Sequence, residues 1–410
     1  MKLKSDPLIS KLFRETLFVM IIAELSTSLA ALLDGVIIAR FLSTNAIAAY
    51  GLTSPYTNMI KMLGGFFGTG TQIVFSGYAA RFQKDKANNV FSLTALLLLV
   101  FSLTISLLMF VFAEPLALAL GASKDAEQLL RLTAAYLKGL AVGTPFQLGV
   151  LFLIPLMNID GDKKRIALSL NVMMVTNLIG DLIVAFCFDG NIFGMALTTS
   201  ISCFCAFTVL MLHFKNDTVI RFTLRGACFD DVCQVSKQGL VPAVTRSFSM
   251  IRSYVLNIIV ISLAGTGVLA ANSLVQSNIK IVPACIVTAI GSATLSLASV
   301  LYAEKDKPGL KQLLLSAVKI SFGPCLVIAV LTFAFADQIA MLFGVGETVT
   351  LVAQALRYFI IGLPFIGIKM FYIYYFQASE HNIGLRIISK KAKSMQYVSV
   401  FNLNNFVITL

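Results

Sequence analysis

Residues 88–113 read NNVFSLTALLLLVFSLTISLLMFVFA, a run without a single charged side chain. A helix needs about 20 mostly apolar residues to cross the hydrocarbon core of a bilayer, so this segment is long enough to span it. The run begins one residue after Lys84-Asp85-Lys86 and ends directly before Glu114. Charges at both ends and none within are typical of a transmembrane helix.

The whole chain has the same character. Of its 410 residues 58% are apolar and 13% charged, whereas about 25% are charged in soluble domains. These values exclude a water-soluble enzyme or nucleic-acid binder, even though the net charge is +12. We expect ten spanning helices, near residues 15–40, 50–80, 88–113, 128–157, 166–188, 191–213, 238–262, 272–302, 312–335 and 350–378.

Positive charges alternate between the loops and so predict the topology. Loops on one side carry clusters such as Lys163-Lys164-Arg165, whereas the alternate loops carry Lys124 and mostly acidic residues. The positive-inside rule places the cationic side, with the N-terminus and the 216–237 linker, in the cytoplasm. The N-terminus lacks a small-residue cleavage signal, so we interpret its apolar run as a first span and not as a signal peptide.

The two halves of the chain repeat each other with a shift of 219 to 223 residues. Matching anchors are Ala46–Tyr50 with Val268–Asn272, Lys84–Lys86 with Lys305–Lys307, Glu114 with Asp337, Tyr136 with Tyr358, and Pro145-Phe146 with Pro364-Phe365. Six spans return the chain to the same side, which predicts parallel repeats about an axis normal to the membrane. We therefore expect an all-α multi-pass protein with an N-terminal six-helix lobe (1–215), a cytoplasmic linker (216–237) and a C-terminal lobe (238–410).

We expect the second repeat to be incomplete. With a shift of about 222 it should end near residue 437, but the chain ends at Leu410. After Ala378 the only apolar candidate is 395–410, which is too short for a span and contains three Asn residues. We expect that the last two helices are missing or degenerate, through truncation or frameshift. The alternative is a shorter natural variant with a re-entrant or surface segment.

Three acidic residues, Glu24, Asp34 and Asp181, lie inside apolar spans. A charge at the bilayer centre costs about 2.5–3.5 kcal/mol on insertion scales, which makes such residues functional candidates. Asn177 precedes Asp181 by one helical turn, and Thr199 lies on the next span. Asp34 is predicted at a depth similar to that of Asp181. Asp34, Asn177, Asp181 and Thr199 would form an oxygen cage for Na⁺, or a pair of carboxylates that shares a proton.

The less specific interpretation is that Asp181 only hydrogen-bonds Asn177 and joins helices. Glu24 is a weaker candidate because it lies about 80° around the helix from Asp34. It would either couple to the cation or pair with a basic residue such as Arg252.

Basic residues also occur inside the predicted spans, namely Lys61, Lys138, Arg246, Arg252, Lys280 and Lys369. One interpretation is a basic cavity that prefers anionic or zwitterionic cargo. The other is that Lys138 extends toward the interface and the rest pair locally. Gly64, Gly65, Gly68 and Gly70 indicate either close helix packing or a flexible point. We find no phosphate-binding glycine loop, nucleophile elbow or metal-spaced His pair, so neither an enzyme nor a cofactor is expected.

In these features the chain resembles the multidrug and toxic compound extrusion (MATE) family. The resemblance rests on Leu33-Asp34-Gly35, Ala46–Gly51, Asn177-x-x-x-Asp181, Gly194–Thr199, Gly239–Pro242 and Pro364-Phe365, in that order. It implies a twelve-helix, V-shaped exporter coupled to Na⁺ or H⁺. In its DinF-like branch the N-terminal cation site matches Asp34, Asn177, Asp181 and Thr199. The chain departs from many members in lacking a proline near Leu17–Met20.

The leading hypothesis is a cation-coupled antiporter that exports small organic molecules or drugs. A lipid-linked saccharide flippase of the same superfamily is the first alternative, and a membrane enzyme or sensor is a distant one. The expected partners are a small-molecule substrate and membrane lipid, without nucleic acid, and the expected state is a monomer. The expected location is the bacterial plasma (inner) membrane, with Na⁺ or H⁺ as coupling ion and no cofactor.

Overall fold

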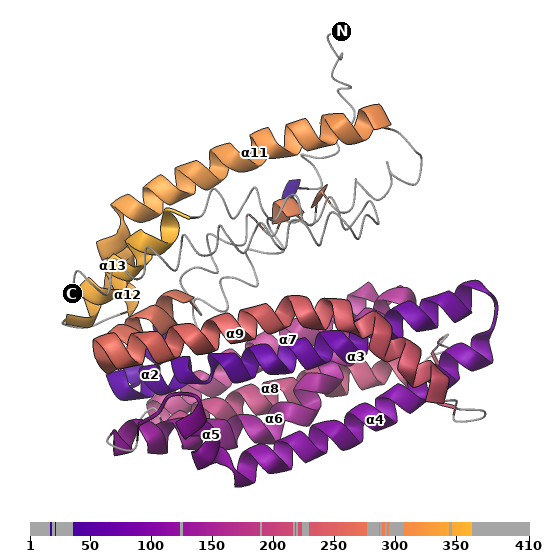
Figure 1. The fold of residues 1–410 in the computed structure, drawn as a ribbon, viewed down its shortest axis with the longest axis horizontal. Helices are drawn as coiled ribbons and strands as arrows, with labels where there is room; N and C mark the ends of the chain where they lie inside the picture. Colours follow the sequence, from indigo (N-terminus) through magenta and orange to yellow (C-terminus); the bar gives the residue numbers. More distant parts are fainter. Residues whose placement is uncertain are drawn as a thin grey trace. The chain divides into compact units, whose positions relative to one another are not determined.

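The structure is a computed structural model that describes residues 17–18, 21, 36–123, 126–188, 191–215, 218, 220–223, 229–276, 287, 289–291, 293–294, 307–343 and 347–362. These residues are helical or in turns and loops, without a strand (Figure 1). The chain divides into two compact units, one of residues 41–270 and one of residues 1–40 with 271–410. The lobe boundaries expected from the sequence stay a prediction.

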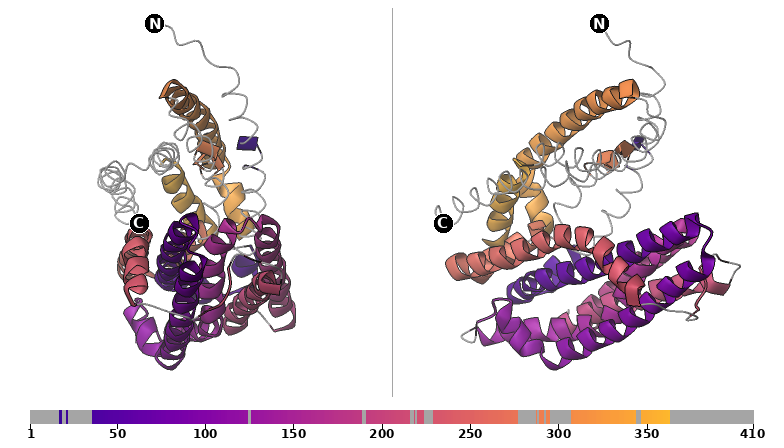
Figure 2. Two further views of the ribbon diagram at one scale, coloured as in Figure 1. Left: turned by 90° about the vertical axis from the view of Figure 1, so that its right-hand side faces the viewer. Right: turned by 45° about the vertical axis from the view of Figure 1, so that its right-hand side comes forward.

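The unit of residues 41–270 is a helical bundle (Figure 2). Its helices are α2 (Thr44–Leu52), α3 (Ser54–Ala80), α4 (Lys84–Val111), α5 (Ala113–Ala119), α6 (Glu127–Ile159), α7 (Lys163–Cys187) and α8 (Ile192–Met211), followed by the 3₁₀ turn η1 (Leu212–Lys215) and most of α9 (Phe229–Leu274). The predicted spans 88–113, 128–157, 166–188 and 191–213 coincide with α4, α6, α7 and α8 to within a few residues.

Two elements have bounds that differ from those expected from the sequence. The run predicted as one span at 50–80 is divided at Thr53 between α2 and α3, and α2 begins after the cap residue Ser43, whose side chain accepts a hydrogen bond from the Ala46 amide. Helix α9 begins at Phe229, so the expected linker overlaps its first turns. Among the described residues five helices are long and apolar enough to cross a membrane, or six when one bent pair is counted as a span.

Helix α6 is the centre of this bundle and packs against α3, α4 and α8. Glycines allow these approaches. A Cβ on Gly143 would lie 2.4 Å from Ser200 Oγ of α8, and one on Gly64 would lie 2.5 Å from Leu151 Cβ of α6. A Cβ on Gly68 would likewise meet the Leu151 carbonyl oxygen at 2.7 Å. Of the two interpretations of the α3 glycines, the structure supports close helix packing.

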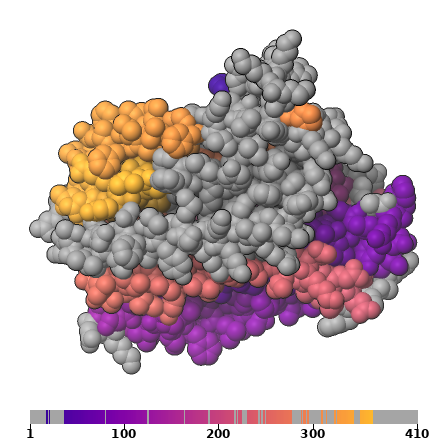
Figure 3. Space-filling model, turned by 45° about the horizontal axis from the view of Figure 1, so that its top comes forward, coloured from indigo at the N-terminus to yellow at the C-terminus, as the bar shows by residue number. Residues whose placement is uncertain are grey.

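The outer faces of the bundle are apolar. On α4 the exposed side chains are Leu96, Leu97, Leu99, Val100, Phe101, Leu103, Leu107, Leu108, Phe110 and Val111. On α9, which lies at the surface of its unit in Figure 3, they include Leu240, Val244, Phe248, Ile251, Val255 and Leu263. Exposed leucines over a whole helix face would be unstable against water but are stable against lipid, which fits a multi-pass membrane protein.

The other unit repeats an arrangement found in the first. Helices α11 (Lys307–Ala334), α12 (Ala336–Phe343) and α13 (Glu347–Ile360) follow the order of α4, α5 and α6, a long span, a short helix and a further helix. The break after α11 bends the chain by 73°. Asp337 on α12 pairs with Arg357 of α13 at 2.6 Å, and Arg40 donates to the Met341 carbonyl at 2.7 Å, at the end of α12. The internal repeat predicted from the sequence is therefore confirmed in the backbone.

A buried alanine-rich segment also recurs between the first two spans of each half. Gly265 adopts φ +77° and breaks the long α9, and the residues after it, Val268–Asn272, match the anchor Ala46–Tyr50 within α2. Only glycine adopts this backbone conformation without strain. In both copies the alanine-rich segment is buried, with Ala48, Ala49, Ala270 and Ala271 fully inaccessible.

Candidate functional site

Three of the four residues predicted for the cation site, Asn177, Asp181 and Thr199, lie where α7 packs on α8. These helices are neighbours in the chain, and α8 begins after Asn191, whose side chain caps the Phe193 amide at 3.0 Å. Gly180 on α7 faces Thr198 on α8 so closely that a Cβ on Gly180 would lie 2.8 Å from Thr198 Cγ2. Gly194 on α8 faces Val184 in the same way, at 2.9 Å. The two glycines thus fix the spacing of the helices around Asp181.

Asp181 is the buried carboxylate of this interface, with 2% of its surface exposed. Its Oδ1 forms a hydrogen bond with Thr198 Oγ1, across the gap that Gly180 leaves. Thr198 is buried as well, at 7% exposure, and its hydroxyl also reaches the Met195 carbonyl oxygen at 2.7 Å. The sequence analysis proposed Thr199 and missed Thr198.

A hydroxyl has one proton, which gives the Thr198 contacts two chemical states. When Asp181 is ionised, Thr198 donates to the carboxylate. When Asp181 holds a proton, the carboxylic acid donates to Thr198, and Thr198 donates to the Met195 carbonyl. The same pair of residues therefore satisfies both protonation states of the carboxyl group without a change of fold.

Asn177 and Thr199 lie beside this pair. The Asn177 amide Nδ2 is 3.5 Å from Thr199 Oγ1, a long hydrogen bond, and Thr199 Oγ1 is 3.3 Å from the Met195 carbonyl oxygen. Asn177 and Thr199 are both partly buried. The structure thus places Asn177, Asp181 and Thr199 at one helix interface. Asp34, the fourth residue of the predicted cage, lies outside the described residues, and so does Glu24.

The predicted basic cavity is described only in part. Lys61 on α3 and Arg252 on α9 have exposed side chains, and Lys138 on α6 is partly buried. Lys280, Lys369 and the side chain of Arg246 lie outside the described residues, as does the Glu24 partner suggested for Arg252. The cavity, with its preference for anionic cargo, stays a prediction.

Polar contacts also connect α2 and α3 to α9. Asn58 Nδ2 donates to Ser253 Oγ at 3.0 Å, Asn257 Nδ2 donates to the Gly51 carbonyl at 2.9 Å, and Tyr78 OH donates to Asp231 Oδ1 at 2.8 Å. Between them, a Cβ on Gly70 would meet the Val235 carbonyl oxygen at 2.6 Å. These contacts extend along much of α3 and α9. Side chains on distant parts of the chain form them, and the sequence analysis missed them.

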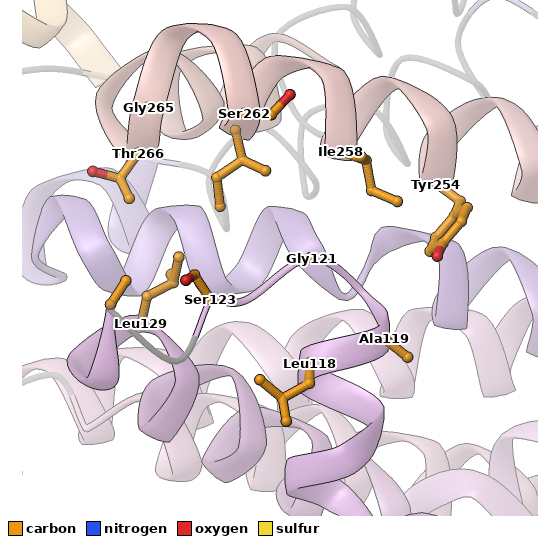
Figure 4. A pocket seen from close by; sticks show the side chains of 12 residues that line it. Leu118, Ala119, Gly121, Ser123, Leu129, Tyr254, Ile258, Ser262, Gly265 and Thr266 are labelled. Carbon is orange, nitrogen blue, oxygen red and sulfur yellow. The ribbon is translucent and has the colours of Figure 1, made fainter.

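A cavity of about 600 Å³ lies between α9 and the segment that joins α5 to α6 (Figure 4). Its wall is mostly apolar, with Leu118, Leu129 and Ile258, and it includes the hydroxyls of Ser123, Tyr254 and Thr266. None of the residues described as lining it is charged, and none belongs to the Asp181 site. The cavity and the buried carboxylate are therefore separate features of the unit of residues 41–270.

Comparison with known proteins identifies the relatives of this chain. The MatE family model matches residues 20–183 and 242–387, one segment in each half of the repeat. The multidrug export protein MepA of Staphylococcus aureus (strain NCTC 8325 / PS 47) is 29% identical over 187 residues, which are 45% of this chain and 40% of that protein. MepA of Staphylococcus saprophyticus is 32% identical over 181 residues, 43% of this chain and 39% of that protein. These matches therefore span less than half of the curated relatives.

Solved structures agree on the fold. The inward-facing conformation of a multidrug resistance MATE family transporter of the MOP superfamily is similar with a TM-score of 0.79 and 22% identity, covering 90% of this chain and 86% of that one. A MOP superfamily transporter from Pyrococcus furiosus, described as having a binding pocket of reverse polarity that suggests a different function, is similar with a TM-score of 0.71 and 23% identity, covering 93% and 85%. Both have the fold that the repeat predicts.

Proposed function

This chain belongs to the MatE family, and on that premise we propose that it is a cation-coupled antiporter that exports small organic molecules across the bacterial plasma membrane. Members of this family are transporters and not enzymes. The observation that carries the proposal is the buried carboxylate of Asp181, which bonds to a hydroxyl of the adjacent helix. The fold is a multi-pass helical one, in which such a residue is costly.

The cost of burying Asp181 is the physical reason to assign it a function. The energetic cost of a buried, ionised carboxylate falls when it binds a proton or a metal cation. Either event changes the charge at the α7–α8 interface. A conformational equilibrium shifts when a ligand binds one state more tightly than the other, so cation loading from one side of the membrane and release on the other can drive alternating access.

The donor set fits a proton or a hard monovalent cation. Asp181 supplies carboxylate oxygens, Thr198 and Thr199 supply hydroxyls, and Asn177 supplies an amide. Oxygen ligands of this kind suit Na⁺, whereas soft metals favour sulfur. Asp34 completes this site in our proposal, as the resemblance to the DinF-like branch implies.

The proposed cargo is a small organic molecule or drug. The curated relatives are named multidrug exporters, and the alternative of a lipid-linked saccharide flippase gains no support from them. We place the N-terminus in the cytoplasm, from the distribution of basic residues between loops. The protein acts as a monomer in this proposal, with its cargo and membrane lipid as partners.

The test is export from cells that lack their own efflux pumps. Cells that produce this chain should accumulate less ethidium, a cationic dye, or less of a fluorescent zwitterionic quinolone than cells with an empty vector. The variant Asp181→Asn should remove the difference. Asp85→Asn, which changes an exposed carboxylate on α4, is the matched control and should export like the parent chain. Equal export by Asp181→Asn and the parent, at equal amounts in the membrane, would contradict the proposal.

A further inference from the structure

His213 lies buried between two carboxylates at the end of the bundle that the charge pattern assigns to the cytoplasm. Its Nδ1 is 2.8 Å from Asp162 Oδ2, and its Nε2 is 2.9 Å from Asp160 Oδ2. Only 3% of the surface of His213 is exposed. The three side chains come from three elements, since Asp160 caps the end of α6, Asp162 precedes α7 and His213 belongs to η1 after α8.

The geometry is satisfied when the ring carries two protons. A neutral imidazole has one N–H and one lone pair, so it can donate to only one of the two carboxylates. The other nitrogen would then place its lone pair against the oxygen of an ionised carboxylate less than 3 Å away. The doubly protonated imidazolium donates to both, and such charge-assisted bonds are the stronger ones.

Asp162 is ionised in this arrangement. The hydrogen bond from His213 lowers the pKa of its carboxyl group, against the desolvation that raises it, and the Arg165 amide adds a further bond at 3.2 Å that lowers it. A carboxylate held in its charged form accepts from His213 and does not donate to it. The proton between Asp162 and His213 therefore belongs to the histidine.

Several charged groups surround His213. Arg165 Nε is 3.5 Å from Asp162 Oδ2. Phe214, which is next to His213, contacts the ring edge-on and stacks on Phe91 of α4, which makes that side apolar. Lys164 on α7 and Lys215 on η1 are exposed cations at the same end.

The turn between α6 and α7 presents both acids to the ring. Asp160 and Asp162 flank Gly161, whose φ of +75° lets the chain reverse within three residues. The ring nitrogens point in opposite directions, so the three groups surround a ring and do not converge on one metal ion.

We propose that His213, with Asp160 and Asp162, is a second proton-binding site of this protein, which holds the α6–α7 turn to the end of α8 while it is protonated and releases it in alkali. This site is independent of the Asp181 carboxylate and of any transport activity. It would make the cytoplasmic end of the bundle sensitive to the pH on that side.

The chain offers a direct test because it has only two histidines, His213 and His381. In the full-length His381→Gln variant, labelled with ¹⁵N-histidine and embedded in lipid nanodiscs, every imidazole signal comes from His213. At pH 7.5 both ring nitrogens should carry protons. A neutral ring with one protonated nitrogen at this pH would overturn the proposal.

Two further variants separate proton binding from simple packing. Asp160→Asn and Asp162→Asn, each in the His381→Gln background, should shift most of the His213 rings to the neutral form at pH 7.5, because each removes one anionic acceptor. An unchanged protonation state in both variants would also overturn the proposal.

A further measurement compares the melting temperature of His381→Gln with that of His213→Gln/His381→Gln from pH 6.5 to 9.5. In this proposal the folded chain holds the proton to a higher pH than the unfolded chain does, so the stability due to His213 is present at low pH and lost as pH rises. The gap in melting temperature should therefore close in alkali. A gap that stays constant with pH would show a packing role only and contradict the proposal.

Discussion

Thr198 on α8 is hydrogen-bonded to Asp181 on α7, and both side chains are almost completely buried. The bond crosses the interface at the one position where α7 carries a glycine, Gly180, opposite the threonine. The hydroxyl has a second acceptor in the Met195 carbonyl. The hydroxyl can thus donate to the ionised carboxylate or accept a hydrogen bond from the protonated carboxyl group.

Replacement of Thr198 should weaken cation binding more than replacement of Thr199. A hydrogen bond to a charged group contributes about 1.5–3 kcal/mol, so Thr198→Ala should lower the apparent affinity for the coupling cation about ten- to a hundredfold. Thr198→Ser keeps the hydroxyl and should stay close to the parent. The measurement is the cation concentration or pH that gives half-maximal efflux. Equal effects of Ala and Ser would show that the methyl group and not the hydroxyl matters.

Gly180→Ala should separate the two helices at the site. Its Cβ would lie 2.8–2.9 Å from the Thr198 side chain, and overpacking of this kind costs about 1–3 kcal/mol. The melting temperature in detergent should fall. Gly77→Ala on α3 is the control, because nothing lies within 4 Å of its Cβ position, and alanine there should leave stability unchanged or raise it. A drop of equal size in both variants would argue against close packing at Gly180.

Asp162 should stabilise the fold above its ordinary pKa and lose this contribution gradually at lower pH. Its pKa is lowered from 3.8 in the folded chain, first by the hydrogen bond from His213, so the unfolded chain takes up a proton at a higher pH than the folded chain does. Its contribution is therefore complete above about pH 4 and is lost as pH falls through the lower, folded value. Asp162→Asn keeps a side-chain oxygen for the cap of α7 but lacks the charge. The stability difference between parent and variant should shrink on acidification from pH 6 to pH 3, and a difference that grows would contradict the account.

Asp34 and Asp181 should behave as one site. If both carboxylates serve the same cation, the double variant Asp34→Asn/Asp181→Asn should lose no more transport than either single variant, because residues that act as a unit are not additive. Rates of ethidium efflux from everted vesicles measure this. Single variants with partial losses that multiply in the double variant would place the two carboxylates in separate roles.

Hydropathy and charge predicted the spans well because a bilayer imposes length and polarity on each helix separately. The predicted span at 166–188 corresponds to α7 (Lys163–Cys187), and the 222-residue repeat reappears in α11, α12 and α13. The repeat could be detected from the sequence because its anchors are loop charges and alanine-rich segments. A requirement for apolar helices alone would not produce such matches in both halves.

The site was predicted only in part, for a geometric reason. Asn177 and Asp181 share a face by their spacing, but whether Thr198 or Thr199 meets Asp181 depends on the rotation of α8 about its axis. That rotation is fixed by contacts such as Gly143 with Ser200, between α6 and α8. The histidine site was missed because its two acids lie in a loop, where no helical periodicity indicates which way they point.

The most direct test of the central claim uses purified protein in liposomes loaded with ethidium, with an inward gradient of either Na⁺ or H⁺. The account predicts that at least one gradient drives export by the parent and by Asp85→Asn, and that neither gradient drives it in Asp181→Asn. Gradient-driven export by Asp181→Asn at the parental rate would contradict the account.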